Sequence, residues 1–318
     1  MERMKKLLHH RYMAMAVPFI MLAAASLLFG TLTGGSFLTA KNLNSIFEQG
    51  LVVAVCAMGI AFIYTTGNVD MSVGAIIMLS GIIGGKIFLA TGSVLLLFLS
   101  AFACAAVMQF LNGLISTILG LRTMVAAILM TQIYNAVSQQ VLGATFINIY
   151  KAVKGVASGS FRYVLFTGLF IIFIAIYHGT SIGRSLRFIG GNERCAKAVG
   201  MDKKIMIRIS YIFAAIAVGM ASVFSLIRTG NVTATPNNMG SDIMLATVLG
   251  GMSIFGGYKS NVYSGVIGAF TVIVLSNGLL MLGVDASVIQ GVKGVIFLAV
   301  VYLNSDREDL LPHRNQFT

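Results

Sequence analysis

The sequence predicts an all-α fold, a polytopic transmembrane helical bundle of about ten spans that forms a single domain over residues 1–318. Composition and patterning support this fold. Hydrophobic residues make up 57% of the chain and charged residues only 10%, whereas charged residues are about 25% of an average soluble domain. Apolar runs recur from Tyr12 to Leu303 with only one long polar interruption. A chain of this kind lacks the charge to cover a water-exposed surface.

The spans follow from the lengths of the apolar runs. A helix that crosses the hydrocarbon core needs about 20 mainly apolar residues, and shorter runs suffice inside a bundle. The expected spans lie near residues 12–32, 50–66, 72–90, 94–119, 124–142, 162–178, 208–228, 243–256, 262–282 and 288–303. The first run is longer than the apolar part of a typical signal peptide and further spans follow, so we expect a retained helix.

Basic residues predict the orientation of the bundle. The formal net charge is +12, but Lys and Arg lie between apolar runs and are not interleaved with aromatics, which argues against a nucleic-acid partner. With both termini cytoplasmic, most of them fall in cytoplasmic segments, including the polar loop at 179–207. The outer segments receive Lys41, Lys86, Lys151, Lys154, Arg162 and Arg228. This asymmetry indicates a multi-pass protein of the cell (inner) membrane, with cytoplasmic N- and C-termini.

Two expected spans, near 50–66 and 243–256, are short and end in Gly-rich polar turns, TTGNVDMSVG at 65–74 and FGGYKSNVYSG at 255–265. Interrupted segments in corresponding positions suggest an internal repeat with broken helices, the best sequence indication of a transport pathway. We expect the backbone to line a cavity at Gly67, Gly74, Gly256 and Gly257. Most other glycines are expected to serve helix packing.

Charged residues at the ends of the spans, or within one, have expected roles. Asp70, in GNVDMSVG, is expected to hold the exposed amides that start the next helix, a structural role compatible with a functional one. Asp242, in SDIMLA, is likewise expected to cap a helix. Lys293 falls inside the last span, where it either extends its amine to the interface or pairs with a carboxylate.

The sequence predicts no enzyme, no metal site and no cofactor. The nearest match to a nucleotide-binding P-loop, SGIIGGKI at 80–87, lacks the first Gly and the final Ser or Thr and falls within a span. The four His residues fall at expected cytoplasmic ends, so none is placed to pass protons through the membrane centre. Loop carboxylates such as Glu193 and Asp202 have no neighbouring His ligand set, and no nucleophile has a base.

Five segments carry a resemblance to one family. They are the run at 42–76 with its turn TGNVDMSVG, and the segments at 111–123, 181–211, 245–257 and 275–284. In the same order, they resemble the ribose-type (simple sugar) permeases of ABC transporters over nearly the whole chain after the first span. The turn departs from the family pattern Thr-Gly-Gly-x-Asp-Leu-Ser-Val-Gly at Asn68 and Met71, and the usual Pro-containing stretch after Arg122 is missing.

The resemblance implies an inner-membrane permease subunit for a simple sugar such as ribose, xylose or galactose. An extracytoplasmic binding protein would deliver the sugar, and separate ATPase subunits would bind and hydrolyse ATP. A second permease subunit would complete a homo- or heterodimer. The loop at 179–207 would hold a coupling helix, with Gly190, Gly191, Asn192, Glu193, Ala196, Val199 and Gly200 as coupling residues. The residues expected in the pathway or at a helix break are Gly67, Asn68, Asp70, Ser72, Gly74, Asn112, Gly256, Gly257 and Asn277.

Other functions share parts of this pattern. An ABC permease for a nucleoside, an autoinducer or a branched-chain amino acid would have the same architecture. An ion-coupled secondary carrier would bind substrate and ion within one chain, and an intramembrane enzyme would need a catalytic set. The lack of carboxylates at the bilayer centre and the coupling-like loop favour the ABC permease.

Overall fold

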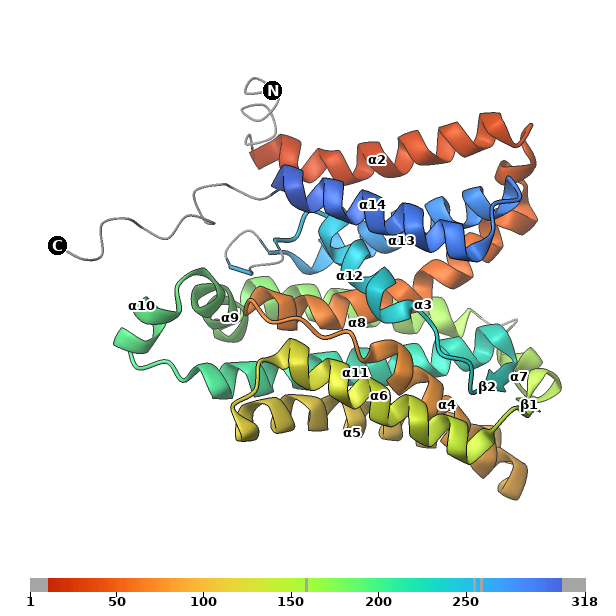
Figure 1. Ribbon diagram of the computed structural model, residues 1–318, viewed down its shortest axis with the longest axis horizontal. Helices are drawn as coiled ribbons and strands as arrows, with labels where there is room; N and C mark the ends of the chain where they lie inside the picture. Colours follow the sequence, from red (N-terminus) through yellow and green to blue (C-terminus); the bar gives the residue numbers. More distant parts are fainter. Residues whose placement is uncertain (1–10, 158–159, 254–255, 258–259, 305–318) are drawn as a thin grey trace.

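The computed structural model describes residues 11–157, 160–253, 256–257 and 260–304 as a bundle of helices that run roughly along one direction (Figure 1). The longer helices are α2 (Arg11–Leu32), α3 (Ala40–Thr65), α4 (Val73–Thr91), α5 (Val94–Leu119), α6 (Thr123–Leu142), α8 (Phe161–Gly179), α11 (Lys203–Thr229), α13 (Val262–Met281) and α14 (Ala286–Asn304). The shorter elements are η1 (Ser36–Leu38), α7 (Tyr150–Ala157), α9 (Ser181–Gly191), α10 (Glu193–Ala198), α12 (Met239–Leu249) and the strands β1 (Phe146–Asn148) and β2 (Asn231–Thr233). The chain is therefore nearly all-α, as predicted.

Among the described residues, six helices are long and apolar enough to cross a membrane: α3, α4, α5, α8, α11 and α13. Shorter apolar helical segments lie at Pro18–Leu32, Met239–Leu249 and Ala286–Tyr302. A membrane-spanning bundle is thus confirmed, whereas the expected number of about ten spans is not.

Helix α3 forms the centre of the bundle. Every residue from Gly50 to Thr65 is buried, and α3 packs mainly against α11 and α13. The sequence predicted a short span near 50–66, and that prediction is wrong because the helix already begins at Ala40. Its first turns are mostly exposed and carry polar residues, so hydropathy alone placed the start of the span too late.

Helix α5 shows how the outside of the bundle differs from its centre. Its exposed residues include Leu95, Leu99 and Ile118, with 74%, 58% and 67% of their surface accessible. Exposed apolar surface on this scale is unfavourable in water and marks contact with another apolar phase. Bilayer lipid satisfies this requirement, because in lipid an apolar exterior carries no hydrophobic cost.

A small antiparallel sheet interrupts the all-α pattern, and the sequence did not predict it. Strand β1 pairs with β2 so that Ile147 lies opposite Val232. Both of these side chains are buried against the bundle, while their neighbours in each strand point outward. The sheet lies at the end of the bundle opposite α9 and α10 (Figure 1).

The first helix begins, and the last helix ends, on the same side of the bundle as α9 and α10. Figure 1 shows that α2 begins and α14 ends there. The chain ends themselves, expected in the cytoplasm, lie outside the described residues, as do 254–255 and 258–259 within the expected Gly-rich turn.

Candidate functional site

The inner interruption is the stretch 66–72 that separates α3 from α4. At its start the Gly67 amide donates to the Tyr64 carbonyl at 2.9 Å, and Gly67 has a φ of 76°, which residues with a Cβ atom rarely adopt. Thr123, at the start of α6, donates to Asn68 Oδ1 at 2.9 Å. Asn68 Nδ2 in turn donates to Thr66 Oγ1 at 2.8 Å. The chain is therefore interrupted where the sequence predicted, and the interruption is attached to α6.

A polar cluster, the Asp70 network, holds the end of this stretch. The Asp70 side chain is fully buried, and its Oδ1 accepts from the Ser72 amide at 2.8 Å and the Ser72 hydroxyl at 2.6 Å. Its Oδ2 accepts from Gln109 Nε2 at 2.9 Å. Asn112 Nδ2 donates to Ser72 Oγ at 2.7 Å, and Tyr134 donates to Asn112 Oδ1 at 2.9 Å. The network joins α4, α5 and α6 across the bundle.

Asp70 has nearly the role that the sequence predicted, which was to hold the exposed amides at the start of the next helix. It holds the amide of Ser72, the residue immediately before α4, so it supports the helix start from one turn outside the helix. A buried carboxylate needs several donors to compensate for lost water, and here all of its donors are neutral. Gln109 and Tyr134 were missed, although Gln109 and Asn112 have the i, i+3 spacing that places both on one face of α5.

An outer interruption, residues 234–238, precedes α12 and contacts the first turn of α4. A Cβ atom on Gly240 would overlap the Met71 carbonyl oxygen, and one on Gly74 would overlap Asn237 Oδ1. Asn237 Nδ2 also donates to the Gly74 carbonyl at 3.4 Å. The inner interruption therefore meets the first turn of α12, and the outer interruption meets the first turn of α4, although these segments are far apart in the sequence.

The expected partner of the turn at 65–74 was the turn at 255–265, and this pairing is corrected in part. Gly256 and Gly257 do contact the end of α3. The contact with Met71, however, comes from Gly240 of α12, and the contact with Gly74 comes from Asn237 of the outer interruption, which the sequence did not single out. The residues of the outer interruption look like an ordinary loop after α11, because nothing local indicates that Asn237 contacts α4.

A second cluster, the glycine junction, consists of Thr65, Gly67, Gly190, Gly256 and Gly257. The Gly257 amide donates to the Thr65 carbonyl at 3.0 Å. A Cβ atom on Gly190 of α9 would overlap that same carbonyl oxygen, and one on Gly256 would lie 2.5 Å from the Gly67 nitrogen. Three backbone segments thus approach so closely that only glycine fits at their contacts.

Tyr177 adds side-chain contacts beside the glycine junction. Its hydroxyl lies 2.9 Å from Thr65 Oγ1 and donates to the Ser260 carbonyl at 2.7 Å. The Arg187 guanidinium of α9 lies 5.2 Å from the centre of the Tyr177 ring, within the range of a cation–π interaction. The end of α8, the loop before α13 and α9 are therefore held together.

The expected coupling loop forms two short helices, α9 and α10. Asn192 caps α10 by accepting from the Cys195 amide at 3.0 Å, and Gly200 ends the turn after α10 with a φ of 80°. Ala196 is buried, whereas Val199 is 64% exposed. The ammonium groups of Lys203 and Lys197 hydrogen-bond to the Glu193 carboxyl and lower its pKa.

Asp242 and Lys293 form an ion pair with 2.9 Å between Oδ1 and Nζ. Pairing of Lys293 with a carboxylate, one of the two predicted alternatives, is thus confirmed. The capping role expected for Asp242 is wrong: Asn238 is the residue before α12, and the Asp242 side chain reaches α14 instead. The remaining pathway candidate, Asn277, lies in α13 outside these clusters, and its buried Oδ1 has no partner among the described residues.

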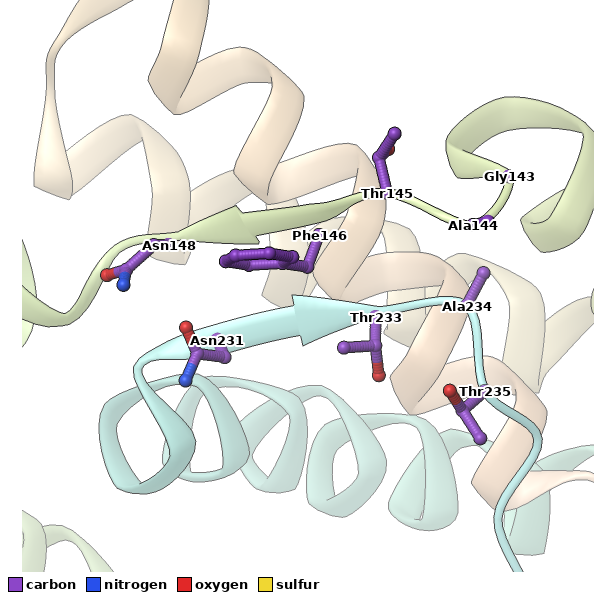
Figure 2. Close-up of a pocket in the computed structure, with 9 residues that line it drawn as sticks. All are labelled: Gly143, Ala144, Thr145, Phe146, Asn148, Asn231, Thr233, Ala234 and Thr235. Atoms are coloured by element: carbon purple, nitrogen blue, oxygen red, sulfur yellow. The ribbon is translucent and has the colours of Figure 1, made fainter.

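The β1–β2 sheet, called the outer sheet below, forms a polar pocket at the end of the bundle opposite α9. Figure 2 shows Phe146 and Asn148 of β1 facing the same side as Asn231 and Thr233 of β2. The pocket has a volume of about 460 Å³. It contains no charged side chain, so it provides a neutral surface of amides, hydroxyls and one aromatic ring.

Comparison with known proteins agrees with this architecture. The family model described as branched-chain amino acid transport system / permease component matches residues 42–301. The D-allose transport system permease protein of Escherichia coli K12 is 29% identical over 90% of both chains. The ribose import permease protein of the same strain is 26% identical and covers 86% of this chain and 88% of its own. The galactose/methyl galactoside import permease protein is 29% identical, covering 85% and 88%.

The fold also has a counterpart of known structure. An ABC transporter described as being of the metal-chelate type, in an inward-facing conformation, aligns with a TM-score of 0.50 and 15% identity. The alignment covers 90% of this chain and 99% of that one. With the family match over residues 42–301, these similarities lead to one conclusion: the chain belongs to the branched-chain amino acid transport system permease family of ABC transporters.

Proposed function

We propose that this chain is the membrane permease subunit of an ABC importer for a simple sugar of the ribose, xylose or galactose type. The permeases for D-allose, ribose and galactose, which it resembles over most of their lengths, support this function. The chain provides the path across the membrane. It has no cofactor of its own, because ATP is bound and hydrolysed by separate subunits.

The glycine junction is the observation that carries this proposal. Helix α9 lies on the expected cytoplasmic side, and its Gly190 touches the last carbonyl of α3 directly. Backbone contacts without intervening side chains transmit a displacement with little loss, because close-packed contacts are stiff. When an ATPase displaces α9, the end of α3 and the loop at Gly256 and Gly257 therefore move with it.

The movement continues from the glycine junction into the membrane. The inner interruption follows directly after α3, and the Asp70 network fastens it to α4, α5 and α6. Through Met71 it also touches Gly240 at the start of α12. Closure of the ATPase thus changes the contact between the inner interruption and the start of α12, a shear movement of packed helices.

The partners follow from the same geometry. The α9–α10 pair docks on the ATPase through exposed residues such as Val199, while buried Ala196 keeps α10 on the bundle. A second permease subunit completes the path, and an extracytoplasmic binding protein delivers sugar at the end that holds the outer sheet. Both termini lie in the cytoplasm, and the rest of the exterior contacts the lipid bilayer.

The test is transport by the complete complex. Native-membrane purification should bring an ATPase and a binding protein along with the chain. In proteoliposomes, that complex should take up radiolabelled D-allose, D-ribose or D-galactose only with ATP. Uptake of leucine or uridine in place of all three sugars would assign a different substrate class, and uptake driven by a proton or sodium gradient without ATP would reject the importer.

A variant in the turn after α10 tests the coupling to the ATPase separately from the pathway through the membrane. Gly200 adopts a φ of 80°, so Gly200→Val strains the turn that follows α10. We expect wild-type membrane insertion and sharply reduced ATP-driven uptake. Unchanged uptake in this variant would exclude a coupling role for the turn.

A further inference from the structure

A cavity of about 190 Å³ lies between the inner interruption, α12 and α14. We propose that this cavity, the α12–α14 cavity, is a subsite that holds one monosaccharide on its way through the membrane. This inference rests on the proposed function and adds to it the residues that contact the sugar. They are Met71, Ser241, Asp242, Met244, Leu245, Gln290, Lys293, Gly294 and Phe297.

The position of the cavity is the first argument. Met71 belongs to the inner interruption, and its carbonyl meets Gly240 in the first turn of α12. The α12–α14 cavity therefore borders the point where the inner interruption meets the start of α12. Broken helices of this kind form the binding sites of membrane transporters.

The charges of the cavity are the second argument. Lys293 lies in the middle of an apolar helix, with 7% of its side chain exposed, and its partner Asp242 has 18% exposed. Ionisable groups within the membrane are costly and mark substrate pathways by default. The pair is neutral as a whole, so it favours neither an anion nor a cation. Hydroxyl groups can donate to the carboxylate and accept from the ammonium, as those of a neutral sugar do.

The other residues that line the cavity suit both the polar hydroxyl groups and the apolar C–H face of a sugar ring. The Gln290 amide can donate and accept, and among the described residues it has no hydrogen-bond partner, so it is available to a ligand. Phe297, Met244 and Leu245 provide an apolar surface for the C–H face of the ring. The cavity volume of about 190 Å³ equals that of roughly six water molecules at about 30 Å³ each. This is enough space for one monosaccharide that replaces the water.

Two glycines of α14 make a matched test possible. Gly294 lines the cavity, and Gly291 does not. At both positions a Cβ atom would meet open space, so Gly294→Leu and Gly291→Leu are each compatible with the fold. Only the leucine at position 294 occupies the space of the sugar.

The experiment measures ATP-driven uptake of D-allose, D-ribose and D-galactose by the reconstituted complex. We expect Gly294→Leu to lower uptake of the transported sugar about tenfold or more, because the leucine side chain fills space that the sugar needs, and Gly291→Leu to leave it near wild type. Equal uptake by both variants would overturn the subsite while the importer function stands. If wild type transports none of the three sugars, the proposed function and the subsite both fail.

Labelling of a cysteine keeps the inference testable if Gly294→Leu does not assemble. Cys56, Cys104 and Cys195 are free thiols, so Gly294→Cys and Gly291→Cys are placed in a chain whose three native cysteines are alanine. The transported sugar should slow the reaction of Cys at position 294 with a methanethiosulfonate reagent and leave position 291 unaffected. Equal rates at position 294 with and without sugar would overturn the subsite.

Discussion

The region around Asp70 and the region beside the start of α12 differ in how tightly they are packed. Around Asp70 the space is filled: this fully buried residue accepts hydrogen bonds from neutral donors, and glycines fill the contacts near Gly67. Beside the start of α12 there is a cavity, and Asp242 is paired with a cation. The region around Asp70 has no space for a ligand, whereas the region beside α12, which Met71 and α14 also line, has room for one.

This difference predicts how each region tolerates change. A full region responds to added or removed atoms with loss of packing or hydrogen bonding, so its variants should lose stability and transport together. An open region can lose transport while the fold is kept. The following predictions are ordered from the largest expected effect to the smallest.

Gly190→Ala should have the largest effect, because its methyl group would overlap the Thr65 carbonyl oxygen. Overpacking against a backbone costs about 3 kcal/mol or more where nothing can move. We expect loss of ATP-driven uptake together with a lower unfolding temperature of the purified complex. Gly191→Ala is the matched control, since a Cβ atom at that position meets no neighbour. Equal behaviour of the two variants would remove the glycine junction from the mechanism.

Asp70→Ala should destabilise the protein by about 3 kcal/mol, because the donors on Ser72 and Gln109 lose their buried acceptor. Asp70→Asn should cost about 1 kcal/mol or less. Its Oδ1 still accepts from Ser72, and the Gln109 amide can turn so that Oε1, which now has no partner among the described residues, accepts from the new amide. Thermal unfolding of the two variants checks this order. An equal loss in both would show that the negative charge itself is required.

Lys293→Met leaves the Asp242 carboxylate without its cation and should cost about 3 kcal/mol, as expected for a broken buried ion pair. Adding Asp242→Asn removes the unpaired charge and should restore most of the unfolding temperature. Sugar uptake should stay low in the double variant, because the ligand contacts are gone. Recovery of both stability and uptake would mean that the pair serves packing alone.

Glu193 should have the smallest effect, and it depends on pH. Its pKa in the folded protein lies below the ordinary value of 4.5 because Lys203 and Lys197 hydrogen-bond to it. Its ion pairs therefore stabilise the fold above about pH 4.5, and the contribution is lost as the pH falls through the lowered pKa. An exposed pair is worth about 0.5 kcal/mol. Thermal unfolding measured from pH 7 down to about pH 3, a range that extends below the ordinary pKa of 4.5, should show this loss in wild type and not in Glu193→Gln.

The sequence alone was sufficient for the fold class, the family resemblance and the position of the interruption between α3 and α4. Long uncharged runs require helices in a membrane, because only internal hydrogen bonding satisfies the backbone there. The turn from Gly67 to Gly74 is recognisable because Gly and Asp have strong local preferences. The short helices in the loop at 179–207 follow from a polar segment between two spans.

Only the tertiary structure decided which distant segments meet. The contact of Gly190 with Thr65, the donors of Asp70 on α5, and the pairing of Lys293 with Asp242 join residues from different helices. In an almost uniformly apolar chain, hydrophobicity specifies that each helix lies in the membrane but not which neighbour it packs against. That choice depends on the fit of small residues and the pairing of polar groups between helices, and these exist only once the bundle has formed.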